Sequence, residues 1–412
     1  MKQESRQGIY IFLALISGII VGALLHSDSP PELAISTFTL LGETIFLGLL
    51  KMLIIPLVAV SVIVGITSSS SGLGRLGTLT FIYFGSTMLI AVVIGLLLVT
   101  LINPGIGFPT SNYIAPELAV TSAKGIFENL IDQIIPGNIF SELSSGNPLP
   151  VIVFSIFFGI LLSIHRKSSE NIISLFRSLF HILMEMVQVV LILAPLGIFC
   201  LLAKTVTLVG LSIFTESLGL YMLTVTLGLL IHGGLILPAI AYIFTRENPY
   251  RFAFQVKKAL ITALGTSSSS ATLPVSIECA TEEAKISKTT AGLVLPVGST
   301  VNMDGTALYE AVAVVFLAQA FGVTLGGAEL FIIAITATLA AVGAAGIPSA
   351  GLVTMVVVIE AVNQSLGAVV IPVAAVGIIL GVDRFLDMFR TTVNVWGDLV
   401  GAKIIDKIMP IE

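Results

Sequence analysis

The chain has 412 residues, of which 56% are hydrophobic and only 10% are charged, with a formal net charge of −5. Because a soluble domain carries about 25% charged residues, this composition excludes an ordinary soluble protein. The small net charge and the lack of a basic block argue against a nucleic-acid partner. Cys200 and Cys279 lie in unrelated segments, so neither a disulfide framework nor a cysteine metal site is expected.

Apolar runs of about 18 residues or more recur along the chain and predict a multi-spanning helical membrane protein. The first six spans are expected at about 8–25, 40–68, 77–101, 151–164, 172–206 and 218–244. The first run resembles a signal peptide in outline, but it is too long and no A-x-A cleavage site follows it. The stretch 103–147 is polar and rich in proline and glycine, which indicates a connection outside the membrane.

Basic residues mark alternate ends of successive spans and therefore predict the topology. They are Lys2, Arg6, Arg75, Arg166, Lys167, Arg246, Arg251, Lys257 and Lys258. By the positive-inside rule the N-terminus is cytoplasmic, and we expect the C-terminus on the same side. The short chain and compact loops favour the inner (plasma) membrane of a prokaryote.

Two later apolar stretches are interrupted and predict re-entrant hairpins, each a helix, an irregular tip and a second helix. The first, 259–277, is broken by four serines and Pro274, and the second, 330–358, by the sequence AAVGAAGIPSAG. Irregular backbone at membrane depth occurs only where protein buries it or where it lines a cavity. Paired segments of this kind are the best pointer in a sequence to a transporter binding site.

A polar interruption also lies between the hairpins, in the apolar segment 291–320. Asn302, Asp304 and Thr306 flank Met303 and Gly305 there, which predicts a local break in the helix. A broken helix frees carbonyl groups, and these can ligate a hard cation together with carboxylate and amide oxygens.

The last apolar run, AVVIPVAAVGIILG, reads as the first part of a long membrane helix that continues through 381–401. At about 100° per residue, six polar residues of that helix fall within an arc of about 100°. They are Asp383, Asp387, Arg390, Thr391, Asn394 and Asp398. Since a charge at mid-bilayer costs about 2.5–3.5 kcal/mol, this stripe must face protein, water or a ligand. The alternatives are a solvated helix outside the membrane and charges that pair only to hold helices together.

These residue types suit an acidic amino acid and sodium. Arg390 is a permanently charged clamp for a carboxylate, and Asp387, one turn earlier, can receive an ammonium group. Asp304 and Asp398 with nearby carbonyl groups suit sodium. Three separate polar breaks in neighbouring segments favour a transport site over purely structural pairs.

The chain resembles the dicarboxylate/amino acid:cation symporter family, the glutamate/aspartate transporters that include the human excitatory amino acid transporters and archaeal aspartate transporters. The resemblance runs from LLKMLIIPL onward and is most specific in SSSSATLP, NMDGTALYE, GAAGIPSAG and DRFLDMFRTTVNVWGD. It implies an all-α membrane protein of eight transmembrane helices plus two re-entrant helical hairpins, with an elevator mechanism. It also implies a homotrimer surrounded by lipid, in which each protomer carries its own substrate path.

The resemblance further divides the chain into a scaffold and a mobile transport domain. Residues 1–76 would hold scaffold spans one and two, 77–102 span three of the transport domain, and 103–207 an extracellular loop with scaffold spans four and five. The remaining transport domain, 208–412, would comprise span six, a hairpin at about 253–290, span seven at 291–322, a hairpin at 327–362 and span eight at 366–408. The second hairpin would act as the outer gate.

By motif position, the resemblance implies the ligands of a substrate and three sodium ions. Arg390 would bind the side-chain carboxylate and Asp387 the amino group, completed by Thr391, Asn394, Thr306, Ser268, Ser269, Ile347 and Gly351. One sodium ion would use Asp398 with carbonyl groups of Gly298, Asn302 and Asn394. A second would use carbonyl groups of Ala341, Val342 and Ala344 with Thr300, and a third Asp304, Asn302 and Thr87.

The sequence departs from the family pattern in two places. Phe84 and Met88 stand where relatives often carry a hydroxyl-bearing aromatic residue and a serine near the third sodium site. Ser267 and Met388 stand where different relatives carry an arginine, so neither of those arginines is present. We hypothesise that Arg384, one turn before Asp387, supplies the compensating charge.

Asp387 argues against a C4-dicarboxylate carrier and Arg390 against a neutral amino acid carrier, while the retained Asp398 favours sodium over protons alone. Proton coupling stays open as the alternative within the family. Glutamate and aspartate differ by one methylene, worth only about 1–3 kcal/mol, so the sequence does not separate them. From other classes, an anion channel is compatible with transport. An intramembrane aspartyl protease using Asp383 and Asp387 fits poorly beside Arg390, and we expect no enzyme activity.

Overall fold

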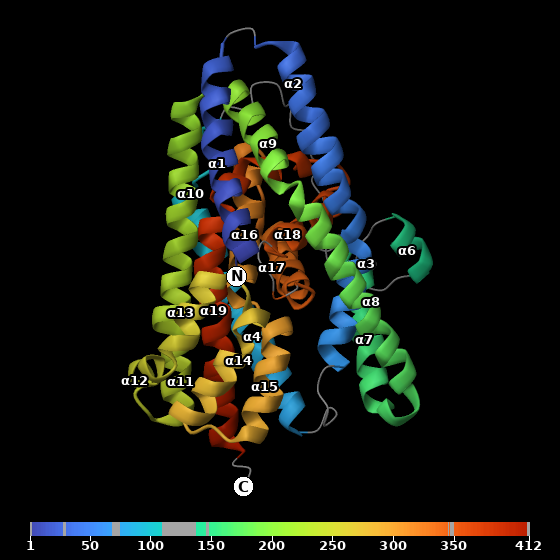
Figure 1. The fold of residues 1–412 in the computed structure, drawn as a ribbon, viewed down its shortest axis with the longest axis vertical. Coiled ribbons are helices and arrows are strands. Elements are labelled where there is room, and N and C mark those ends of the chain that lie inside the picture. The colour runs from blue at the N-terminus through green and yellow to red at the C-terminus, as the bar shows by residue number, and fades with distance from the viewer. Residues whose placement is uncertain are drawn as a thin grey trace.

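The computed structural model describes residues 2–27, 30–67, 75–108, 137–145, 148–344, 346 and 350–409. Every regular element within these ranges is a helix (Figure 1), which confirms the all-α fold class. Figure 1 shows long helices running along the longest axis of the molecule, with shorter paired helices between them.

The helices described in the first half of the chain range from 7 to 28 residues in length. They are α1 (Lys2–Leu25), α2 (Glu32–Phe38), the π-helix η1 (Thr39–Leu47), α3 (Gly48–Thr67), α4 (Arg75–Ile102), α6 (Ile139–Ser145), α7 (Pro148–Ile164), α8 (Arg166–Ile192) and α9 (Ala194–Val209). Helices α2, η1 and α3 follow one another without a gap, so the helix that contains the expected second span begins at Glu32, before residue 40. Pro31 precedes this start and Glu32 occupies the first turn, both of which favour a helix N-terminus.

The span expected at 172–206 is two helices, α8 and α9, that meet at Leu193. The prediction of a single helix was wrong because Pro195, in the first turn of α9, cannot donate a hydrogen bond to the preceding turn. Helix α8 also begins earlier than expected, at Arg166.

The second half contains the interrupted elements. They are α10 (Leu211–Ile231), η2 (His232–Ile236), α11 (Leu237–Thr245), α12 (Pro249–Gln255), α13 (Lys257–Thr266), α14 (Ser269–Glu278), η3 (Cys279–Glu283), α15 (Lys288–Val301), α16 (Asp304–Ala320), α17 (Gly327–Val342), α18 (Ala350–Ser365), η4 (Val373–Ala375) and α19 (Val376–Ile408).

The first hairpin has the predicted form of helix, tip and helix. Helix α13 ends at Thr266, and Ser267 then takes a left-handed conformation with φ of 49°, which reverses the chain. Ser268 begins α14 by accepting a hydrogen bond on its side chain from the amide of Ala271 at 3.1 Å. The tip is therefore built from serine capping.

The expected break between the hairpins is also present, and it lies at Asn302 and Met303. These two residues have non-helical backbone angles between α15 and α16, whereas Gly305 is helical. In the second hairpin, α17 and α18 flank the tip. Gly343, Ala344 and Gly346 are the residues of this tip that the structure describes.

Helix α19 begins at Val376, so only the second part of the expected apolar run, 376–381, belongs to the long helix, and residues 368–375 do not. Asn363 holds this segment as a loop. Its side-chain oxygen accepts from the amides of Val370 and Ile371, and its side-chain nitrogen donates to the carbonyl of Ile371 at 2.8 Å. Pro372 then precedes the short helix η4.

The packing places α16 and α19 at the centre of the second half. Every residue of α16 except Gln319 is buried, including the polar residues Asp304, Thr306 and Glu310. Helix α16 packs against α4, α10, α17, α18 and α19, while α19 also contacts α11, α13 and α15. In the first half, α1 packs along α9, and α3 packs against α7 and α8, which lie together at the right of Figure 1.

Among the described residues, four helical segments are long and apolar enough to cross a membrane: 76–102, 166–190, 216–245 and 288–320. Six shorter apolar helices accompany them, including α17 and α18 of the second hairpin.

Candidate functional site

The polar stripe of α19 is buried along its length. Asp383, Asp387, Thr391, Asn394 and Asp398 are each at most 5% exposed, and Arg390 is fully buried. This burial excludes the alternative that the helix is merely solvated. A long, fully buried arginine is rare unless it is paired, so its partners define the centre of the site.

Arg390 lies between two carboxylates and an aromatic ring. Its Nη2 atom is 2.7 Å from Oδ1 of Asp387 and 3.0 Å from Oδ1 of Asp383. Its guanidinium carbon lies 3.8 Å from the centre of the Tyr309 ring on α16, a cation–π contact. The remaining nitrogens Nε and Nη1 are buried and make no hydrogen bond to any described residue. The guanidinium can therefore accept a further anionic partner.

Arg384 approaches the same cluster from the side. Its Nη1 atom lies 3.9 Å from Oδ2 of Asp387, and its side chain is 31% exposed. The interaction is therefore longer and more solvated than the pairing of Asp387 with Arg390.

Asn394 joins α19 to the start of α16. Its side-chain oxygen accepts from the amide of Gly305 at 2.7 Å, and its side-chain nitrogen lies 3.2 Å from the hydroxyl of Thr306. A Cβ atom at Gly305 would lie 2.6 Å from the carbonyl oxygen of Arg390, so only glycine permits this approach. The predicted substrate residues Thr306, Asn394 and Arg390 are thus brought together.

The tips of the two hairpins touch. The hydroxyl of Ser268 donates to the carbonyl of Gly346 at 2.7 Å, and the amide of Ser270 donates to the same oxygen at 3.1 Å. A Cβ atom at Gly351 would lie 3.0 Å from Nη1 of Arg390, so the start of α18 lies against the guanidinium. Ser269 is buried, and Ile347 lies outside the described residues.

The carboxylates and amides predicted to bind sodium converge near the break in α15–α16. The side-chain nitrogen of Asn302 donates to Oδ1 of Asp398 at 2.9 Å. A Cβ atom at Gly298 would lie 2.4 Å from that same oxygen. Oδ1 of Asn302 and Oδ1 of Asp304 are buried without a hydrogen-bond partner among the described residues. Orphaned buried oxygens of this kind fit a hard cation.

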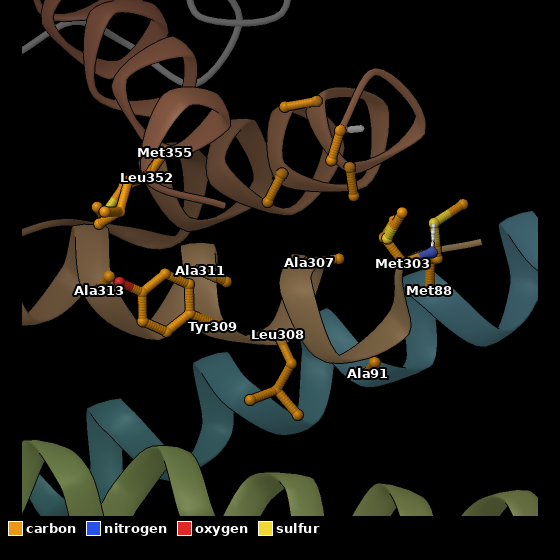
Figure 2. Close-up of a cluster of buried hydrophobic side chains, with 14 of the residues drawn as sticks. Met88, Ala91, Met303, Ala307, Leu308, Tyr309, Ala311, Ala313, Leu352 and Met355 are labelled. Atoms are coloured by element: carbon orange, nitrogen blue, oxygen red, sulfur yellow. Dashed lines mark hydrogen bonds between the residues drawn. The ribbon is translucent and has the colours of Figure 1, made fainter. Parts of the chain in front are cut away.

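Two hydroxyl groups predicted to bind sodium, those of Thr87 and Thr300, form hydrogen bonds within their own helices. The hydroxyl of Thr87 donates to the carbonyl of Phe84 on its own helix at 3.2 Å, and that of Thr300 donates to Val297 at 3.1 Å. Ala341 and Val342 end α17, and Ala344 follows them in the tip. Figure 2 shows Met88 of α4 beside Met303, where the amide of Met303 points to the sulfur of Met88 at 3.5 Å.

Sequence reasoning overlooked three buried polar residues around this site. His232 lies 3.1 Å from Asp304, Tyr309 stacks on Arg390, and Glu310 accepts a hydrogen bond from the Thr354 hydroxyl. An ionisable residue inside an apolar segment is the signal for His232 and Glu310. For Tyr309 the sequence carries no comparable signal, since a buried aromatic residue is usually core.

Comparisons with known proteins identify the family and several relatives of the chain. The model of the sodium:dicarboxylate symporter family matches residues 8–408. The chain is 36% identical to human excitatory amino acid transporter 2, over 95% of this chain and 77% of that protein. It is 37% identical to mouse excitatory amino acid transporter 3, over 97% of this chain and 84% of that protein. With excitatory amino acid transporter 1 of Ambystoma tigrinum it shares 34% identity, over 98% of this chain and 83% of that protein.

Proposed function

The chain belongs to the sodium:dicarboxylate symporter family, and from this premise we propose that it is a sodium-coupled symporter for L-aspartate or L-glutamate. The observation that carries the proposal is the buried Arg390, which pairs with Asp387 at 2.7 Å and has two nitrogens without a hydrogen-bond partner among the described residues. A carboxylate of the substrate would bind these nitrogens, and its ammonium group would bind Asp387.

This pair distinguishes the substrate classes. A C4-dicarboxylate has no ammonium group, so a buried Asp387 would repel this substrate. A neutral amino acid has no side-chain carboxylate for Nε and Nη1 of Arg390, so these buried donors would stay unsatisfied. An acidic amino acid satisfies both side chains. Because Asp383 and Asp387 both pair with Arg390, they are poorly suited to an aspartyl protease, which needs a free pair of carboxylates.

Sodium would bind where the carboxylates of Asp304 and Asp398 approach Asn302. The donor set of carboxylate, amide and carbonyl oxygens suits a hard cation. Sodium entering with the membrane potential gains about 2.3 kcal/mol per charge per 100 mV, so coupling several ions to one substrate would sustain steep accumulation. The alternative is proton coupling. Met88, whose sulfur lies 3.5 Å from the amide of Met303, supplies no hard oxygen ligand for a third sodium ion.

We further propose that α17 and α18 gate the site. The bonds from Ser268 and Ser270 to Gly346 hold the two tips together, so release of the second tip would open a path to the site. The division into scaffold and transport domain, the elevator motion, the homotrimer and the cytoplasmic termini in an inner membrane belong to the same proposal.

The test is uptake of labelled L-aspartate and L-glutamate into proteoliposomes containing the purified chain. We expect accumulation with an inward sodium gradient and none when choline replaces sodium. Accumulation driven by a proton gradient alone would establish the proton-coupled alternative. No accumulation of either amino acid under any gradient would refute acidic amino acid transport.

A further inference from the structure

We propose that His232 is a positioning residue that orients the carboxylate of Asp304 for a cation at the break between α15 and α16. His232 is fully buried, and its Nε2 atom lies 3.1 Å from Oδ2 of Asp304, which is also fully buried. This inference rests on the cation site of the proposed function. It adds His232 as a residue that acts on the site without contacting the cation itself.

The direction of this hydrogen bond follows from the chemistry of the two groups. An ionised carboxylate only accepts hydrogen bonds, so Nε2 of His232 must carry the proton that it donates. With its proton on Nε2 and engaged with Asp304, this atom is unavailable as a cation ligand. His232 therefore acts through Asp304.

The bond also leaves Asp304 with one oxygen held and one oxygen free. Oδ2 is the atom nearest His232, while Oδ1 is buried and has no partner among the described residues. Oδ1 of Asn302, two residues earlier, is in the same condition. Holding one oxygen of a ligating carboxylate is how outer partners fix its orientation, and losing such a partner costs about 10–100-fold in metal affinity.

The backbone of α19 packs closely against Asp304 and Asn302. A Cβ atom at Gly397 of α19 would lie 2.7 Å from Oδ2 of Asp304 and 2.9 Å from the side-chain nitrogen of Asn302. These side chains therefore converge on the backbone at Gly397, whose carbonyl accepts from the hydroxyl of Tyr83 at 3.3 Å. The preceding residue of α19, Trp396, donates from its indole to the carbonyl of Gly233, the residue after His232, at 3.0 Å.

The local helix geometry is unusual at this point as well. His232 begins the π-helical segment η2, between α10 and α11. Short π-helical segments inside α-helices are rare and occur frequently at functional sites. Trp396 thus anchors the segment that carries His232 onto the helix that carries the stripe.

The test compares the thermal unfolding midpoint of the purified full chain across a sodium series, with choline chloride holding ionic strength constant. A ligand that binds the folded state raises this midpoint with its concentration. We expect His232→Leu to need a sodium concentration at least about tenfold higher than the unaltered chain for the same rise in the unfolding midpoint. His232→Gln, whose amide can reach Asp304, should titrate within about threefold of the unaltered chain.

Thr224→Val is the matched control. Thr224 is fully buried on α10, and its hydroxyl donates only to the carbonyl of Leu220 in the same helix at 2.7 Å. A purely structural role for His232 would lower the midpoint equally at every sodium concentration, whereas a positioning role shifts the sodium titration. If His232→Leu does not fold, His232→Asn replaces it, because that shorter amide should not reach Asp304.

Two results would overturn the inference: an unaltered sodium titration in His232→Leu or His232→Asn, or no response to sodium in the unaltered chain. Failure of the proposed function is seen separately, as absent uptake of aspartate and glutamate. Sodium-driven uptake with identical titrations in all variants would refute the role of His232 alone.

Discussion

Helices α8 and α19 are both largely apolar and both carry charged residues, but these charged side chains are mostly exposed on α8, whereas the charged stripe of α19 is buried. On α8 the side chains of Glu170, Arg177, His181 and Glu185 are between 42% and 75% exposed. On α19 the charged stripe is buried, with Arg390 at 0%. The charges of α8 form spaced pairs on the surface of the chain, such as His181 with Glu185 at 3.5 Å. On α19, Asp383 and Asp387 both pair with the guanidinium of Arg390.

The contrast shows that a polar stripe marks a site only when the fold buries it. Exposed ion pairs contribute about 0–1 kcal/mol, and their loss leaves no group stranded. Removing one member of a buried pair costs about 3–5 kcal/mol, because the partner charge stays behind without compensation. Substitutions on the two helices should therefore differ strongly in effect.

The largest difference is expected between the two arginines. Arg390→Ala should reduce aspartate uptake by about a hundredfold or more, since it removes the clamp and strands Asp383 and Asp387. Arg177→Ala on α8 should keep uptake within about twofold. Uptake into proteoliposomes, normalised to folded protein by size-exclusion chromatography, measures both. Comparable losses in the two variants would contradict the assignment of the site to α19.

A steric prediction concerns the approach of α16 to α19. Gly305→Ala should lower the free energy of unfolding by about 1–3 kcal/mol, because its methyl group would overlap the Arg390 carbonyl. Gly219→Ala on α10 has no atom within 4 Å of the added Cβ and should be neutral or stabilising by about 0.5–1 kcal/mol. Thermal unfolding of both variants checks this. An unchanged unfolding midpoint in Gly305→Ala would contradict this close approach of α16 and α19.

Asp387→Asn should weaken aspartate binding by about 10–100-fold, since a charged hydrogen bond to the ammonium group is worth about 1.5–3 kcal/mol. Succinate, which has no ammonium group, should compete relatively better in this variant than in the unaltered chain. Glu185→Gln on α8 is the control and should change neither. Competition of labelled aspartate uptake by succinate measures the switch, and an unchanged ratio of the two affinities would argue against an amino-group partner at Asp387.

The smallest effect is expected at Arg384. It lies 3.9 Å from Asp387 and is partly exposed, so Arg384→Gln should change aspartate affinity or release rate by about two- to fivefold. Binding kinetics on purified protein resolve a change of this size. Unchanged affinity and release would remove Arg384 from the site.

The sequence predicted the parts of the fold that depend on local signals. The serine tip at Ser267, the break at Asn302 and the stripe through Arg390 were all indicated by polar or breaking residues within apolar runs. The start of α19 was wrong because an apolar run does not reveal that Asn363 will hold its first residues as a loop. His232 and Tyr309 were missed because their roles depend on contacts with Asp304 and Arg390, which are distant in sequence.

The most direct test of the central claim, that one buried site binds sodium and an acidic amino acid together, is the affinity of the purified chain for L-aspartate at low and high sodium, measured by calorimetry. Coupled sites change each other's affinity by equal factors. We predict that affinity rises by about tenfold or more as sodium increases, and that Arg390→Ala abolishes binding at every sodium concentration. Aspartate binding that is independent of sodium, or that survives in Arg390→Ala, would contradict the account.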